Sequence, residues 1–139
     1  IVESALALLS DRFTTNSIMV KTEFRSDLPD CEVDSEQISQ TILNILINAD
    51  EAMPSGGELS LKLYWDSEYV YLEISDTGEG MDPERLKKIF DPFFTTKHKG
   101  SGLGLVVVHD IFERHGIQYE VTSEKNKGTT FVIKFKVTG

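Results

Sequence analysis

The chain has 139 residues, the length of one ordinary domain, and its 40% hydrophobic and 27% charged residues are typical of a globular protein. Its formal net charge of -9 argues against nucleic-acid binding through a basic surface and against docking on an anionic membrane. No apolar run approaches the roughly 20 residues of a membrane-spanning helix, and the single Cys31 allows no internal disulfide. These exclusions leave a nucleotide ligand open, because a phosphate site needs only local positive potential.

The first part of the chain predicts a helix, a strand and a longer second helix. The chain starts at Ile1, without an initiator Met, inside the first helical pattern, so we expect a fragment of a longer protein. Asp34 and Gln37 have the spacing of a helix capping box, and Pro54 stops the helix that follows. The predicted elements are a helix over 1–14, a strand over 17–25, a loop over 26–35 and a helix over 36–53.

The remainder of the chain predicts four strands and two helices. The strands over 58–65 and 69–76 are separated by a short turn and form a plausible antiparallel hairpin. Helices interleaved with such strands predict an α+β fold, a two-layer sandwich with helices packed on one face of a mixed, largely antiparallel sheet. The other predicted elements are a short helix over 83–90, a helix over 103–115 that ends at Gly116, and strands over 117–123 and 129–137.

Two asparagines interrupt the apolar stripe of the helix predicted over 36–53. Asn44 and Asn48 lie one turn apart, so their side chains stack on one face of the helix. An unpaired buried amide costs about 1–3 kcal/mol, which indicates a polar object opposite this face. Amide oxygens are hard ligands that suit a Mg²⁺ ion also bound to phosphate oxygens. The alternative is that both amides cap backbone groups or face solvent.

Two glycine-rich segments follow. Segment 76–81 (DTGEGM) comes directly after a strand and begins with a carboxylate, which can accept a hydrogen bond from an exocyclic amine such as that of adenine. Segment 100–105 (GSGLGL) opens the helix predicted over 103–115, where free N–H groups favour phosphate. The alternatives are a tight turn for the first segment and a flexible hinge for the second.

Between the glycine-rich segments lies 89–99 (IFDPFFTTKHK), with three phenylalanines in five positions. A lid over a ligand would explain this composition, with the phenylalanines as anchors and Lys97 supplying charge for phosphate. The alternative is that the phenylalanines belong to the core and the lysines to a solvated tip. That alternative is favoured for Phe90 and Lys99.

In order and spacing, these motifs resemble the GHKL nucleotide-binding superfamily, and most closely the catalytic domain of sensor histidine kinases of the nitrogen-regulation type. The likeness extends over nearly the whole chain. The matching motifs are the N box at 44–53, the first glycine box at 76–81, the F box at 89–94, the second glycine box at 100–105 and the Gly-Thr motif at 128–131.

The resemblance implies a role for each matching residue. Asn48 would be the principal Mg²⁺ ligand, with Asn44 assisting near the phosphates. Asp76 would bind the adenine amino group, helped by a water that Thr129 holds, and residues 91–101 would form a lid over ATP. The implied nucleotide-binding residues are Asn44, Asn48, Ala52, Asp76, Gly78, Gly80, Met81, Lys97, Gly100, Ser101, Gly102, Leu103, Gly104, Leu105 and Thr129, of which Asn44 and Asn48 are also the implied catalytic residues and metal ligands.

By the same resemblance, residues 1–139 would be the ATP-binding catalytic domain of a two-component sensor histidine kinase. This protein kinase would transfer the γ-phosphoryl group of ATP to a histidine on a separate helical-hairpin domain, and its phosphorelay would reach a response regulator indirectly. His98, His109 and His115 are not in the acceptor motif, so turnover would need the missing hairpin domain. We expect the isolated domain to be monomeric and cytoplasmic, whether or not its parent is anchored in a membrane.

Two other functions are weighed against this one. The first is a GHKL ATPase or serine kinase, but hydrolysing relatives carry a glutamate base where this chain has Asn44, whose amide cannot take a proton. The second is a non-catalytic module that senses nucleotide, against which the intact motifs argue. One departure from the family pattern concerns the triphosphate: Glu51 stands where many relatives have Lys or Arg, so no basic contact is expected from this helix.

Overall fold

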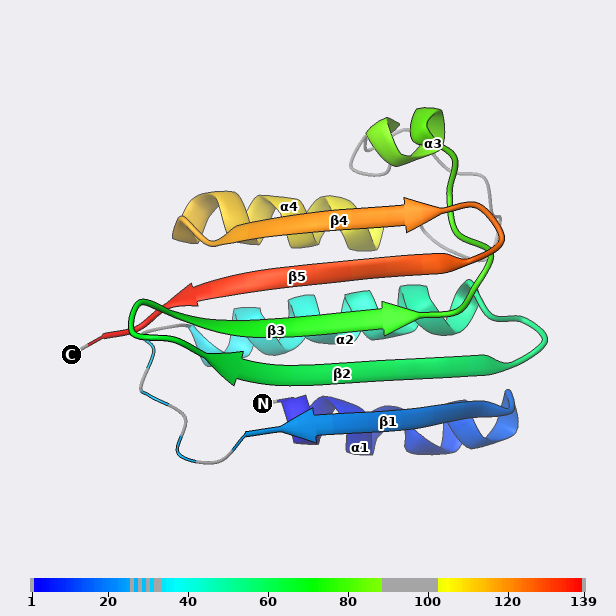
Figure 1. Ribbon diagram of the computed structural model, residues 1–139, viewed down its shortest axis with the longest axis horizontal. Helices are drawn as coiled ribbons and strands as arrows, with labels where there is room; N and C mark the ends of the chain where they lie inside the picture. The colour runs from blue at the N-terminus through cyan, green and yellow to red at the C-terminus, as the bar shows by residue number, and fades with distance from the viewer. Residues whose placement is uncertain are drawn as a thin grey trace.

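The computed structural model describes residues 2–25, 27, 29, 31, 34–88 and 103–138. Within these ranges, helices and strands follow one another in the predicted order, and their bounds agree with the predicted ones to within two residues (Figure 1). None of the helices in the described ranges is both long and apolar enough to cross a bilayer. The elements are α1 (Val2–Thr15), β1 (Ile18–Phe24), α2 (Ser35–Glu51), β2 (Gly57–Trp65), β3 (Tyr69–Asp76), α3 (Pro83–Lys88), α4 (Leu103–His115), β4 (Gln118–Glu124) and β5 (Gly128–Lys136).

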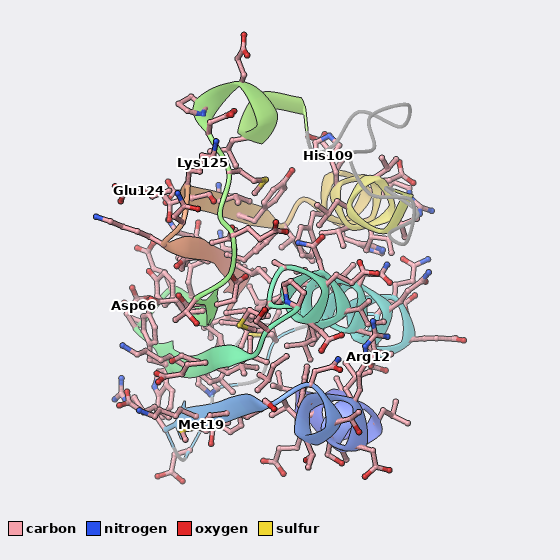
Figure 2. All side chains as sticks on the ribbon, turned by 90° about the vertical axis from the view of Figure 1, so that its right-hand side faces the viewer. Arg12, Met19, Asp66, His109, Glu124 and Lys125 are labelled. Atoms are coloured by element: carbon pink, nitrogen blue, oxygen red, sulfur yellow. The ribbon has the colours of Figure 1, made fainter. Side chains whose placement is uncertain are left out.

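A five-stranded sheet forms one layer of the fold. Its strand order is β1-β2-β3-β5-β4, in which β1 and β2 are parallel and all other neighbours are antiparallel. The helices α1, α2 and α4 pack on one face of this sheet, as the side view in Figure 2 shows. The predicted α+β sandwich, with its mixed and largely antiparallel sheet, is therefore confirmed.

The hydrophobic core lies between the sheet and the helices. Along β3 and β5, buried and half-buried residues alternate, because successive side chains of a strand point to opposite faces. Ile74 of β3 and Ile133 of β5 are buried, and Ile42 and Leu46 of α2 belong to the same apolar cluster. Since each fully buried Leu or Ile contributes about 1.5–3 kcal/mol, this cluster holds α2 firmly on the centre of the sheet.

The start of α2 carries half of the predicted capping box. Asp34 Oδ1 accepts a hydrogen bond from Gln37 N at 3.1 Å, which satisfies one of the N–H groups that a helix leaves free at its first turn. The Gln37 side chain, which would complete the box, contacts His115 Nε2 at the end of α4 instead. The Gln37 side chain therefore ties the start of α2 to the end of α4.

The end of α2 comes two residues before the predicted one. Ala52 N still bonds to Asn48 O, but Met53 N bonds to Asp50 O in a tighter turn, and Pro54 disfavours a helical conformation for the residue before it. The carbonyl of Ala52 is thereby freed from the helix. It accepts a hydrogen bond from the loop after β3, as described below.

A buried carboxylate joins α1 to α2. Asp50 is only 4% exposed, its Oδ2 contacts Arg12 Nε, and its Oδ1 accepts a hydrogen bond from Asn16 Nδ2 at 2.8 Å. Figure 2 shows Arg12 in the space between the two helices. Because a buried carboxylate is costly unless it is paired, these contacts determine how α1 lies against α2.

We expect Arg12→Ala to lower the free energy of unfolding by about 1–3 kcal/mol, because the buried Asp50 loses its charged partner. The Arg12 side chain is 42% exposed, which keeps the loss below that of a fully buried ion pair. Chemical denaturation measures the change. The control is Arg114→Ala, which removes an ion pair exposed on both sides and should cost about 0.5 kcal/mol or less. Equal losses in the two variants would contradict this role for the Arg12 contact.

Candidate nucleotide-binding site

Four segments that are distant in the sequence meet at one end of the sandwich. They are the C-terminal half of α2, the loop after β3, the start of α4 and the start of β5, all at the right-hand end of Figure 1. Each segment carries part of the predicted set of nucleotide-binding residues. The fold therefore gathers these residues on the helix side of one sheet end.

The loop after β3 begins at Asp76, which is 7% exposed. Its Oδ1 accepts a hydrogen bond from Gly78 N at 2.8 Å, so the turn holds the carboxylate in place. Thr129 of β5, which is 5% exposed, lies directly opposite Asp76 in the β3–β5 ladder. Directly opposite residues share one face of a sheet with Cβ atoms about 4.5–5.5 Å apart. A carboxylate and a hydroxyl thus lie together at a buried position.

Backbone contacts fix this loop from two sides. Glu79 N donates to Ala52 O at the end of α2, at 3.0 Å, and Glu79 O accepts from Asn126 N in the β4–β5 turn. A Cβ atom on Gly78 would lie 2.5 Å from the Ala52 carbonyl oxygen and 2.8 Å from the Ala52 side chain. Glycine is therefore required here, and two of the nucleotide-binding residues that the resemblance implies, Ala52 and Gly78, are in direct contact.

The second half of the loop lies against the β4–β5 turn. Gly80 has a φ of +66°, and a Cβ atom on it would lie 1.9 Å from the Glu124 carbonyl oxygen. Met81, which is buried, donates its backbone N–H to Ser123 Oγ of β4 at 2.8 Å. In Figure 2, where this end of the molecule faces the viewer, the loop passes the turn marked by Glu124 and Lys125. The loop is therefore held between α2 and this turn by contacts that leave no room for larger residues.

The two asparagines of α2 are half-buried. Asn48 makes no side-chain hydrogen bond within the part of the chain that the structure describes, so its amide does not cap a backbone group there. For Asn48 this argues against the backbone cap, and a polar ligand and solvent remain as the partners that the sequence analysis offered. A half-buried amide oxygen suits a hard cation such as Mg²⁺, which usually keeps waters and phosphate oxygens as its other ligands.

Residues 103–105 form the first turn of α4, beside the other segments of the site. The N–H groups of a first helical turn have no partner within the helix and favour an anion. The side chain of Leu105 packs against the core, which leaves only its backbone for a ligand. The other predicted contacts and motifs here, namely Lys97, Gly100, Ser101, Gly102, the lid over 91–101 and the F box over 89–94, lie outside the described residues.

The two described histidines of α4 have structural partners. His109 Nδ1 contacts the Tyr119 hydroxyl of β4, and burial, with the charge of Glu113 adding to it, raises the pKa of Tyr119. His115 is exposed and contacts Gln37, as described above. These contacts agree with the packing and surface roles predicted for them, and His98 lies outside the described residues.

Comparison with known proteins identifies the family. Residues 33–139 match the family described as histidine kinase-, DNA gyrase B-, and HSP90-like ATPase. The sensor histidine kinase ZraS of Escherichia coli K12 is 34% identical over 133 residues, which cover 96% of this chain and 29% of ZraS. The catalytic domain of the histidine kinase ThkA superposes with a TM-score of 0.88 at 27% identity, over 99% of this chain and 90% of that one.

The chain belongs to this ATPase family. Its fold is that of a histidine kinase catalytic domain, and full-length ShkA in complex with AMPPNP is similar as well, with a TM-score of 0.86 at 26% identity over 99% of this chain and 30% of that one. The chain spans less than a third of the length of the curated relatives that it matches. The resemblance drawn from the sequence motifs is confirmed for family and fold, while the roles of single residues remain predictions.

Sequence reasoning missed one polar residue of the candidate site. Ser123 contacts both Met81 and Thr129, yet it sits in a strand with ordinary alternation and belongs to none of the recognised motifs. Its neighbours follow only from the register of β4 on β5 and from the path of the loop. No local signal in the sequence could have singled it out.

We expect Gly80→Ala to lower the free energy of unfolding by about 2–4 kcal/mol, through left-handed strain and the clash with Glu124. Gly116→Ala is the matched control: its φ of +65° is nearly the same, but a Cβ atom there would meet nothing within 4 Å. That control should show only the strain, about 1–2 kcal/mol. Thermal and chemical unfolding of both variants measure these free energies. If Gly80→Ala loses no more stability than Gly116→Ala, the loop moves freely away from the β4–β5 turn.

Proposed function

We propose that this domain binds ATP with Mg²⁺ and donates the γ-phosphoryl group to a histidine on a separate helical-hairpin domain of its parent protein. The observation that carries the proposal is the pairing of Asp76 with Thr129 beside α2, in a chain of the histidine kinase ATPase family. The AMPPNP complex of ShkA supports a nucleotide ligand for this fold. The residues of the site divide between a base end and a phosphate end.

The base end recognises adenine by hydrogen-bond acceptors. The carboxylate of Asp76, oriented by Gly78 N, would accept a hydrogen bond from the exocyclic amine of adenine, and Thr129 would hold a water beside it. Met81, whose N–H bonds to Ser123, and Ala52, which contacts Gly78, would supply apolar surface to the ring. Binding beside a loop that backbone contacts already hold would cost little entropy, because the loop itself does not have to be ordered.

The phosphate end lies between α2 and the first turn of α4. Asn48, with Asn44, would hold Mg²⁺ together with the triphosphate, and the bound ion would offset the phosphate charge that this acidic chain cannot neutralise by itself. The N–H groups of Gly104 and Leu105 would donate to phosphate oxygens. In phosphoryl transfer a protein acts mainly by positioning and by stabilising charge, which is what this arrangement offers.

The acceptor imidazole would arrive from the hairpin domain and would itself be the nucleophile. Transfer is favoured over hydrolysis because Asn44 occupies the position where hydrolysing relatives carry a glutamate, and an amide cannot deprotonate water. The proposed partners are ATP and ADP, the hairpin domain of the parent kinase and, through it, a response regulator. We further propose that residues 1–139 act as one cytoplasmic catalytic domain that is monomeric when isolated.

Calorimetric titration with AMPPNP in the presence of Mg²⁺ tests the base end. We expect Asp76→Asn to weaken binding at least about tenfold, because an amide presents a donor where the exocyclic amine needs an acceptor. Asp110→Asn makes the same chemical change at an exposed position of α4 and should leave the affinity unchanged. Unchanged affinity in a folded Asp76→Asn variant would refute the adenine assignment, and no binding by the wild-type domain would refute the proposed function.

The same titration without Mg²⁺ tests the phosphate end. For the wild-type domain we expect tighter binding of AMPPNP when Mg²⁺ is present. Asn48→Ala should remove most of this enhancement, because the ion loses its protein ligand while the base end is untouched. An enhancement as large in Asn48→Ala as in the wild type would place the metal ligand elsewhere.

A further inference from the structure

Ser123, the penultimate residue of β4, is the centre of three hydrogen bonds beside the proposed adenine pocket. It accepts from Met81 N at 2.8 Å, it donates to Gly128 O at 3.0 Å, and its Oγ lies 2.8 Å from Thr129 Oγ1. A serine hydroxyl has one proton to donate and two lone pairs that accept. All three are engaged by neighbouring residues.

This count of protons determines the direction of the contact with Thr129. The three contacts of Ser123 can all be satisfied at once only if its single proton goes to the Gly128 carbonyl and the proton between the two hydroxyls comes from Thr129. Thr129 Oγ1 then has no proton left for a ligand and presents only lone pairs. Asp76, directly opposite Thr129 on β3, is likewise only an acceptor when it is ionised.

We propose that Ser123 is a specificity-determining residue: by taking the proton of Thr129, it makes the pocket a pair of acceptors that selects a base with an exocyclic amine. This inference rests on the proposed function and names a residue that acts on the base through Thr129. A base with an oxo group in place of the amine would bring a third acceptor against two others. A polar site rejects such a mismatched analogue because its own groups are left unpaired.

The sheet contains a matched control pair on its opposite face. Ser75 Oγ and Thr130 Oγ1 also lie 2.8 Å apart across two strands, β3 and β5. Each is the chain neighbour of a pocket residue, Asp76 and Thr129, and successive strand residues point to opposite faces. Ser75→Ala therefore removes the same kind of serine–threonine contact without facing the pocket.

The test compares binding of ADP and IDP, which carry an amino or an oxo group at position 6 of the base, with N1 an acceptor in ADP and an N–H donor in IDP, and which have no γ-phosphate to lose. We expect the wild-type domain to prefer ADP. In Ser123→Ala, Thr129 regains a proton that it can donate to the water it would hold, which frees a proton of that water for the oxo group, so the preference for ADP should fall about tenfold. In Ser75→Ala the preference should remain as in the wild type.

A double-mutant cycle separates this role from a purely structural one. If Ser123 acts through the hydroxyl of Thr129, then adding Ser123→Ala to a Thr129→Val background should not change the ratio of ADP to IDP affinity any further. A structural effect would lower both affinities and leave their ratio unaltered. Circular dichroism checks that each variant is folded, and Ser123→Cys, which has only a weak donor, replaces Ser123→Ala if the latter does not fold.

The outcomes are distinguishable. Wild-type domain that binds neither nucleotide refutes the proposed function itself. Wild-type domain that binds both equally, or a Ser123 variant that keeps the wild-type preference, overturns the inference and leaves the proposed function standing. An equal loss of preference in Ser75→Ala and Ser123→Ala also overturns it, because the effect would then belong to the sheet as a whole.

Discussion

The site depends on the tight packing of the loop after β3 between the end of α2 and the β4–β5 turn. Gly78 lies against the carbonyl of Ala52, and Gly80 lies against the carbonyl of Glu124, with no space for a side chain at either position. These contacts are made by backbone atoms, so they hold the loop without using any side chain that a nucleotide needs. The start of the loop, where Asp76 lies, is thereby fixed relative to the end of α2.

This packing explains how an acidic chain can offer a site for a polyanion. The proposed base end consists of Asp76 and Thr129, and the negative carboxylate of Asp76 does not conflict with an exocyclic amine. The proposed phosphate end needs positive potential only locally, and the N–H groups of the first turn of α4 would supply part of it. The formal net charge of -9 therefore limits which macromolecules the domain can bind, but it does not limit its small ligand.

Much of the fold could be predicted from local patterns. The alternation of apolar residues along a strand and their helical spacing in α2 each arise because one face of the element is buried. The errors lie where distant residues compete for the same group. Gln37 has the spacing to complete a capping box, yet its side chain contacts His115, 78 positions later in the chain. The site could be predicted from motifs that are continuous in sequence, such as 76–81. Ser123 and the contact of Arg12 with Asp50 could not, because only the sheet register and helix packing create them.

The contact between α1 and α2 also matters for the face of α2 that carries the two asparagines. Asp50 follows Asn48 by two positions, so the two side chains point about 200° apart around the axis of α2. Arg12 and Asn16 therefore hold α2 from the side opposite to Asn48, while the core cluster holds it against the sheet. A helix fixed on two sides keeps its third face in a constant orientation. The asparagines are thus arranged before any ligand arrives, and preorganisation of this kind lowers the entropic cost of binding.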